Sequence, residues 1–170
     1  YFLVFLGSVL YLKSRDERWD RLAGISGELG VAYSVFVLIS GPLWAKPIWG
    51  VFWRWEPRLT TMLITFTIYV AYLMVRAYGE PGERNQRFAA VVGIVAFVNV
   101  PLVHYSINMW AAAQQLHPPE IELAPAMLHT KYLCYLAFGC LFVHLMRLRL
   151  SQERVAARLQ QLQRRLDPTP

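Results

Sequence analysis

The 170-residue chain is too apolar to be a soluble domain, because 56% of its residues are hydrophobic and only 16% are charged, where soluble domains average about 25% charged residues. Long apolar runs predict an integral membrane protein instead. The net charge of +6 would suggest nucleic acid in a soluble protein, but here the placement of the basic residues matters more, and we predict no nucleic-acid partner. Cys134 and Cys140 form neither a Cys-x-x-Cys pair nor a c-type haem attachment motif, which argues against a thiol oxidoreductase.

Five apolar segments predict an all-α fold, a polytopic integral membrane helix bundle. They cover residues 1–12, 22–41, 59–78, 88–107 and 126–145. A spanning helix needs about twenty residues, so the short first segment is expected to be the second half of a helix that begins before Tyr1, and the complete protein is expected to have six spans. In the fourth segment, Asn99-Val100-Pro101 predicts a kink, because proline cannot donate the backbone hydrogen bond of a helix interior.

The second segment contains one acidic residue, Glu28. It lies one to two turns inside the predicted helix, where an unpaired carboxylate is costly. We expect it to hydrogen-bond or to reach the charged end of its helix, rather than to act as a proton or cation site, because no second carboxylate falls at helical spacing.

Basic residues collect on one side of the predicted bundle. Thirteen of the seventeen Lys and Arg residues fall in the connections 13–21 and 79–87, at Arg76 and in the tail. The positive-inside rule therefore makes this side cytoplasmic. The stretch 44–60 and the loop 108–125 then share the outer face.

The tail is predicted to be a basic amphipathic helix. Its apolar positions recur at spacings of four, three and four residues: Val155, Leu159, Leu162 and Leu166. This stripe either lies on the membrane surface or pairs with a partner helix. We therefore divide the chain into a transmembrane domain, residues 1–150, and a cytoplasmic tail, residues 151–170.

The stretch 44–60 is unusually rich in aromatic and basic side chains. It holds four of the six tryptophans together with Phe52, and Lys46, Arg54 and Arg58 lie among them. Two prolines and one glycine are expected to interrupt any long regular element here. Trp and Tyr gather at membrane interfaces in any case, but such a belt explains two or three rings and not this density. We predict a flat apolar platform rimmed by cations, suited to a large, planar, anionic ligand.

Three of the four histidines lie toward the outer face. His117 is the candidate axial ligand of an iron porphyrin on the platform, since neutral imidazole binds iron without covalent attachment of the haem; its alternative is an ordinary loop histidine. His104 and His129 are either second ligands or helix-end residues, and we favour the latter. His144 lies at the cytoplasmic end and is interpreted as an interfacial residue.

These motifs resemble one known family. The run from Trp49 to Thr60, preceded by Trp44-Ala45-Lys46-Pro47, is similar to the WWD domain of cytochrome c biogenesis proteins of the CcmC/CcsA family, which includes haem exporter protein C. The resemblance extends to Asn99-Val100-Pro101 and Leu116-His117-Pro118 and covers the chain up to its tail. Glu56 stands where the family usually has Asp.

The resemblance implies a six-helix protein of the bacterial inner membrane, with the WWD loop, about residues 43–60, on the periplasmic side. It implies non-covalent haem b at this loop, held by two histidines, of which one maps to His117 and the other precedes Tyr1. The implied partners are a periplasmic haem chaperone, ABC-transporter subunits of the same maturation system, a small membrane subunit and membrane lipid.

The implied binding residues have distinct roles. The tryptophans wall the porphyrin, the cations reach its propionates, Glu56 fixes the loop by pairing with one of those cations, and His117 holds the iron. The full set is Trp44, Lys46, Trp49, Gly50, Trp53, Arg54, Trp55, Glu56, Arg58 and His117.

We therefore expect a protein that binds haem and hands it over without bond-making chemistry, and hence not an enzyme. The alternative is a membrane-bound haem- or quinone-dependent redox enzyme subunit, with the aromatic loop as the mouth of its substrate site. A third interpretation is a purely structural subunit. Haem absorbance in the purified protein would distinguish the haem-transfer and redox-enzyme interpretations from the structural one. Turnover with an electron donor would distinguish the redox enzyme from the haem-transfer protein.

Overall fold

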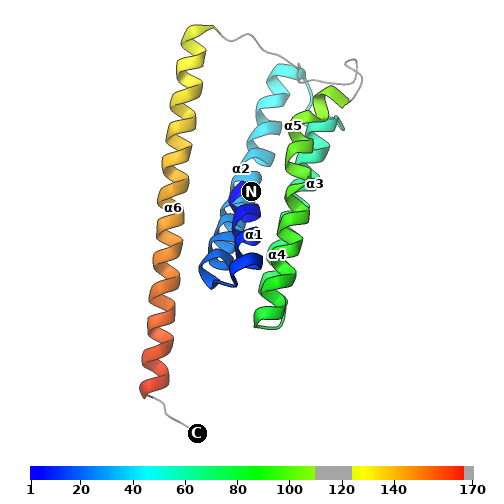
Figure 1. The fold of residues 1–170 in the computed structure, drawn as a ribbon. Coiled ribbons are helices and arrows are strands. Elements are labelled where there is room, and N and C mark those ends of the chain that lie inside the picture. Colours follow the sequence, from blue (N-terminus) through cyan, green and yellow to red (C-terminus); the bar gives the residue numbers. More distant parts are fainter. Residues whose placement is uncertain (110–123, 167–170) are drawn as a thin grey trace. The chain divides into compact units, whose positions relative to one another are not determined.

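The protein is a bundle of α-helices (Figure 1). The computed structural model describes residues 1–109 and 124–166. Its helices are α1 (Phe2–Ser14), α2 (Glu17–Trp49), α3 (Pro57–Tyr78), α4 (Glu83–Phe97), α5 (Asn99–Met109) and α6 (Pro125–Leu166). No strand occurs in the described ranges, so the all-α prediction is confirmed. The chain divides into two compact units, Tyr1–Glu122 and Leu123–Pro170, and each is described by itself.

Four of the described helical stretches are long and apolar enough to cross a membrane. They are α2, α3, the stretch Glu83–Ser106 formed by α4 and α5, and Pro125–Gln163 of α6. These stretches correspond to the last four predicted segments, and the first predicted segment is α1, a shorter apolar helix of 13 residues. The prediction of a polytopic membrane helix bundle is confirmed.

Within the first unit, the helices alternate in direction. The α1–α2 and α3–α4 turns lie at one end, whereas the end of α2, the start of α3 and the end of α5 lie at the other (Figure 1). The two charged connections are therefore on one side of this unit. The tryptophan-rich stretch is on the opposite side, as the charge pattern predicted.

The charged connection between α1 and α2 is shorter than predicted. Only Arg15 and Asp16 separate the helices, and α2 begins at Glu17 rather than at residue 22. Arg15 ends α1 in the left-handed conformation, with φ 59°. Asp16 caps α2, because its Oδ1 accepts the backbone N–H of Arg18 at 2.9 Å. Glu17 and Asp20 then place negative charge in the first turn, where the helix dipole favours it.

The other end of α2 corrects a second prediction. Pro47, Gly50 and Pro57 were expected to interrupt regular structure here. The chain is interrupted between Gly50 and Pro57, but α2 continues past Pro47, as it does past Pro42, to Trp49. Each proline removes one hydrogen bond, and membrane helices tolerate such losses. Gly50 ends the helix instead: its φ of 76° is left-handed, and its N–H bonds to Lys46 O at 2.9 Å. Only residues 50–56 form a loop.

The helix is interrupted next to the predicted position of the kink, because α4 ends at Phe97 and α5 begins at Asn99. Pro101 lies in the first turn of α5, where its missing N–H costs little. The Asn99 side chain secures the break: its Nδ2 donates to Thr61 O at 3.1 Å and to Thr65 Oγ1 at 2.7 Å. One amide therefore joins the start of α5 to α3.

Small residues let the helices of the first unit approach closely. A Cβ on Gly7 would lie 2.9 Å from Trp19 O of α2, and a Cβ on Gly93 would lie 2.9 Å from Ser8 Oγ of α1. Two fully buried tyrosines, Tyr69 and Tyr72, fill the centre next to these contacts. Such small-residue contacts are typical of membrane helix packing.

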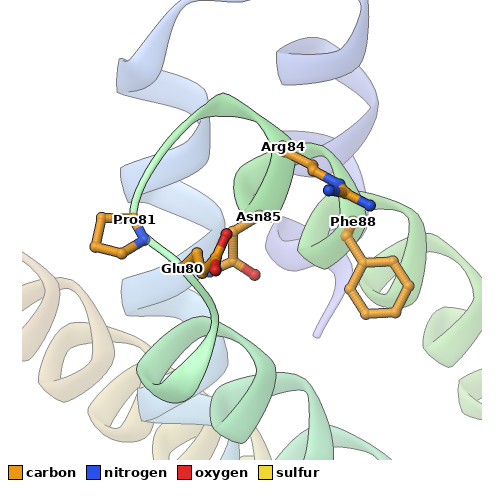
Figure 2. A pocket seen from close by; sticks show the side chains of 5 residues that line it. All are labelled: Glu80, Pro81, Arg84, Asn85 and Phe88. Carbon is orange, nitrogen blue, oxygen red and sulfur yellow. The ribbon is translucent and has the colours of Figure 1, made fainter.

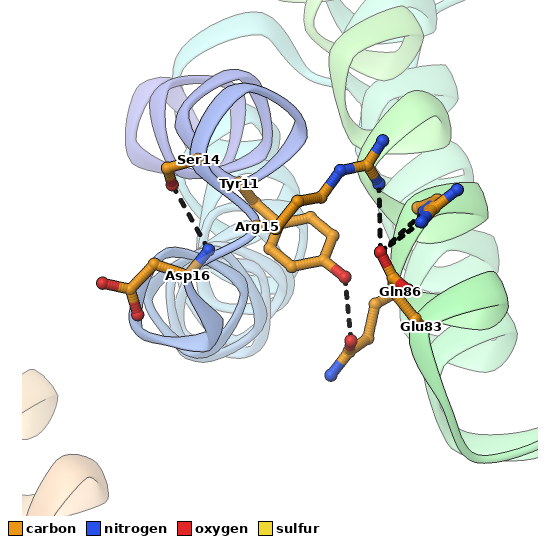
Figure 3. A network of polar contacts seen from close by, with 7 residues as sticks. Tyr11, Ser14, Arg15, Asp16, Glu83 and Gln86 are labelled. Atoms are coloured by element: carbon orange, nitrogen blue, oxygen red, sulfur yellow. Dashed lines mark hydrogen bonds and ion pairs between the residues drawn. The ribbon is translucent and has the colours of Figure 1, made fainter.

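Polar contacts join the helices at the end that carries the charged turns. Tyr11 of α1 donates its hydroxyl to Gln86 Oε1 of α4 at 2.8 Å, and Arg15 lies 3.6 Å from Glu83, which also pairs with Arg87 (Figure 3). These exposed ion pairs contribute little to stability individually.

A buried ion pair joins α2 and α3 near the same end. Arg76 donates through both terminal nitrogens to the Asp20 carboxylate, at 2.6 and 2.8 Å. The side chains of Arg76 and Asp20 are only 21% and 8% exposed. A fork-to-fork contact of this kind is both strong and directional.

The topology can be tested by labelling cysteines in intact cells, starting from a variant that lacks Cys134 and Cys140. A membrane-impermeant maleimide is expected to label Gln114→Cys, and to label Asn85→Cys and Gln161→Cys only after the membrane is opened. The reason is that basic connections stay on the cytoplasmic side. Labelling of Gln114→Cys from the cytoplasmic side alone would contradict the topology.

Candidate functional site

The tryptophan-rich stretch forms two aromatic pairs at the end of the first unit that lies opposite the charged turns. Trp44 and Trp49, on the last turns of α2, meet edge to face with ring centroids 5.0 Å apart. Trp53 and Trp55, in the loop between α2 and α3, do the same at 5.6 Å. Edge-to-face contact suits the charge distribution of aromatic rings. Within each pair, one ring therefore helps to hold the other in place.

Much of this aromatic surface is open. Trp44 is 56% exposed, Phe52 55% and Trp55 74%, while Trp49 and Trp53 are partly buried. We call these five rings the aromatic platform. Exposed apolar surface of this extent marks contact with lipid, with a protein or with an apolar ligand.

The three cations of the stretch have different surroundings. Lys46 Nζ donates to Gly50 O at 2.9 Å and lies 5.2 Å from the centroid of the Phe52 ring. With one of the three N–H donors of its ammonium group, Lys46 therefore helps to fix the end of α2. Arg54 is exposed in the loop, and Arg58 is exposed in the first turn of α3.

A cavity of about 420 Å³ adjoins the platform between α2, α3 and α5. Its lining is mostly apolar and is formed by Val37, Leu38, Gly41, Pro42, Trp53, Arg58, Leu59, Met62 and Val103. The Trp53 Nε1 atom is buried and has no hydrogen-bond partner among the described residues. An apolar cavity with one cation in its lining has the form of a small-molecule site.

Sequence reasoning identified Trp53 and Arg58 but missed the rest of this cavity. Gly41-Pro42 inside an apolar helix was a usable signal, because proline removes an intrahelical bond and glycine leaves space beside it. Met62 and Val103 gave no signal, since they meet only through the packing of α3 against α5.

Glu56 occupies a structural position at the start of α3. It precedes Pro57, the first residue of the helix, and its carbonyl accepts the N–H of Thr60 at 3.0 Å. Glu56 is only 1% exposed, and a buried carboxylate needs partners. Its pairing with Lys46, Arg54 or Arg58 stays a prediction.

The histidines do not form a metal site within the described residues. His117 lies outside those residues, so its role as an axial ligand stays a prediction. His104 is exposed on α5, with its ring 5.2 Å from that of Tyr105. His129 and His144 are exposed on α6. No group of three or more His, Cys, Asp or Glu side chains converges in the described ranges.

A second pocket, of about 340 Å³, lies at the opposite end of the first unit. Glu80, Pro81, Arg84, Asn85 and Phe88 line it, at the turn between α3 and α4 (Figure 2). It contains none of the predicted site residues. The platform and its cavity are therefore the better candidate.

The fold and the site together define a polytopic helical membrane protein with an exposed aromatic platform and a cavity at one end of its helices. The chain belongs to the Heme exporter protein C (CcmC) family, whose model matches residues 1–165. The membership predicted from the WWD-like motif is confirmed.

Curated relatives that bear the name Heme exporter protein C include proteins from three bacteria with the following similarity to this chain. The relative from Bradyrhizobium diazoefficiens is 32% identical, over 93% of this chain and 60% of its own length. The relative from Rhodobacter capsulatus is 29% identical, over 96% and 69%. The relative from Escherichia coli K12 is 29% identical, over 65% and 44%. The chain thus spans about half to two thirds of the length of these relatives.

Proposed function

We propose that this protein binds haem b non-covalently at the outer face of the bacterial inner membrane and transfers it to a periplasmic haem chaperone for cytochrome c maturation. The observation that carries the proposal is the aromatic platform with its adjoining cavity, in a chain of the Heme exporter protein C family. Haem is a substrate to be passed on, and no covalent bond of the porphyrin is made or broken; only the bond between the iron and its histidine ligand forms and is released.

The chemistry of the platform suits a porphyrin. Exposed indole rings offer broad apolar faces. Arg54 and Arg58 are the leading candidates for the propionates, because Lys46 already donates to Gly50 O. Gly50 lets the chain turn directly from the helix into the loop.

The proposed partners follow from this role. A periplasmic chaperone would receive the haem, ABC-transporter subunits would drive its release, and a small membrane subunit and lipid would contact the spans. Since transfer needs only release of the iron ligand and of the ring contacts, we propose no enzyme activity.

The proposal is tested by haem content and spectra of four purified variants. His117→Ala is expected to lose haem or to shift its absorbance and spin state, because the iron loses a direct bond. His144→Ala, on α6, is the control and should keep the unchanged spectrum. His104→Ala and His129→Ala test the competing ligands.

Two outcomes would count against the proposal. An unchanged spectrum in His117→Ala, with loss of haem in His104→Ala or His129→Ala, would show that the ligand assignment is wrong. Absence of haem binding in the unsubstituted full-length protein would overturn the function itself.

A further inference from the structure

Helix α6 is longer than a membrane crossing requires. It runs without a break from Pro125 to Leu166, 42 residues, or about 63 Å at 1.5 Å per residue. The hydrocarbon core is about 30 Å thick, which corresponds to about twenty residues. Arg147 and Arg149 follow the apolar part, so roughly twenty further residues extend beyond the membrane as one helix (Figure 1).

This extension has no residue at which it would bend onto the membrane surface. Neither glycine nor proline occurs between Cys140 and Leu166, and sharp helix bends almost always need such a residue, a bulge or an inserted group. The helical conformation is also continuous across the membrane boundary. A helix lying flat in the headgroups is therefore disfavoured.

Apolar residues follow a heptad pattern along the extension. Residues spaced alternately by three and four form what we call the tail seam: Leu145, Leu148, Gln152, Val155, Leu159, Leu162 and Leu166. This spacing corresponds to positions a and d of a left-handed coiled coil, with Gln152 as the single polar a residue. No other described element of its own unit covers this seam.

The positions that flank the seam identify its partner by charge. At positions e and g between residues 149 and 163, the side chains are Arg149, Ser151, Ala156, Arg158 and Gln163, and none is acidic. In a parallel pair of identical tails, Ser151 would face Ala156 and Arg158 would face Gln163, which gives no attraction. Arg149 already donates to Gln152 Oε1 within α6, at 3.4 Å. A partner with carboxylates at these positions would pair with Arg158.

We propose that the tail seam of α6 binds an amphipathic helix of a partner protein, in a parallel coiled coil whose flanking e and g positions are acidic. The apolar seam supplies the contact surface, Arg158 selects an acidic partner, and Gln152, the single polar a residue, fixes the register. The seam shares no residue with the proposed haem site on the platform.

The test uses the full chain in nanodiscs of zwitterionic lipid and two synthetic 21-residue helices. Both probes carry Leu at a and d, with Gln opposite Gln152; one has Glu at all e and g positions and the other has Lys. The acidic probe should bind at least ten-fold more tightly than the basic probe, and the preference should weaken with salt. Equal binding of both probes, or no binding of the acidic one, would overturn the proposal.

Matched variants separate the seam from general charge attraction. Leu159→Glu should abolish binding of the acidic probe, whereas Ala157→Glu, with the same added charge on the opposite face, should leave most of it. Arg158→Glu should abolish the preference between probes, whereas Arg154→Glu, outside the e and g positions, should leave it. Equal effects within either pair would contradict a coiled coil.

A bimane label on Leu159→Cys, in a variant without Cys134 and Cys140, distinguishes a partner helix from three other possible occupants of the tail seam: the membrane surface, a second copy of the chain and another part of the same chain. The fluorescence emission of the label should shift to shorter wavelength when the acidic probe is added, and should not shift when the nanodisc contains anionic lipid. A shift caused by anionic lipid alone would assign the seam to the membrane surface. Spontaneous disulfide formation between two unlabelled Leu159→Cys tails would assign it to a second copy, and a label already shielded without probe would assign it to the same chain.

Discussion

Replacing Asp20 by Asn is expected to destabilise the protein by about 3–5 kcal/mol, because it leaves the guanidinium of Arg76 buried without its counter-charge. The substitution keeps the size of the side chain, removes its charge and replaces one of the two oxygens that accept the short hydrogen bonds by an N–H donor. The measurement is thermal or SDS-induced unfolding of the purified protein in detergent.

Glu83→Gln is the matched control, since it makes the same carboxylate-to-amide change in an exposed ion pair. Its expected cost is about 0–1 kcal/mol. The double variant Asp20→Leu/Arg76→Met should recover most of the loss, because apolar residues can replace a buried ion pair. Equal stability of Asp20→Asn and Glu83→Gln would contradict the role of this pair.

Replacing Trp49, Trp53 and Trp55 together by Ala is expected to weaken haem binding strongly. An aromatic contact contributes about 0.5–1.5 kcal/mol beyond its buried area, so three such contacts would amount to roughly ten-fold to thousand-fold in Kd. Single substitutions should be mild. The measurement is a haem titration of the full-length protein, followed by absorbance.

Two comparisons distinguish the platform from a general loss of structure. Trp19→Ala, at the opposite end of α2, should leave haem affinity unchanged. The triple Phe variant, which keeps aromatic faces but no indole N–H, should retain more affinity than the triple Ala variant. If the triple Ala variant and Trp19→Ala bind haem equally well, the platform hypothesis is wrong.

The sequence predicted the spans well because a membrane leaves few alternatives. Hydrocarbon requires every backbone group to bond within the segment, so a long apolar run such as α3 has only one practical structure. The ends of helices were predicted less well. Around Asp16, charged residues suggested a loop, although an Asp cap followed by acidic residues is a helix start.

The candidate site was predicted only in part, because some of its residues are close in sequence and others meet only in the folded bundle. The tryptophans and cations are close in sequence, so their grouping was readable directly. The cavity depends on Met62 of α3 and Val103 of α5, and the Asp20–Arg76 pair joins residues 56 positions apart. Contacts of this kind arise only when the helices pack, and a single sequence does not display them.

The Asn99 side chain fixes the position of α5 relative to α3 along their axes. Sliding α5 along α3 by one turn, about 5.4 Å, would break both of its hydrogen bonds, to Thr61 O and to Thr65 Oγ1. Helix α3 begins directly after the tryptophan loop, and α5 is followed in the chain by the segment that contains His117. The two hydrogen bonds of the Asn99 side chain therefore fix the position of α5 relative to the tryptophan loop, along the direction of the helices.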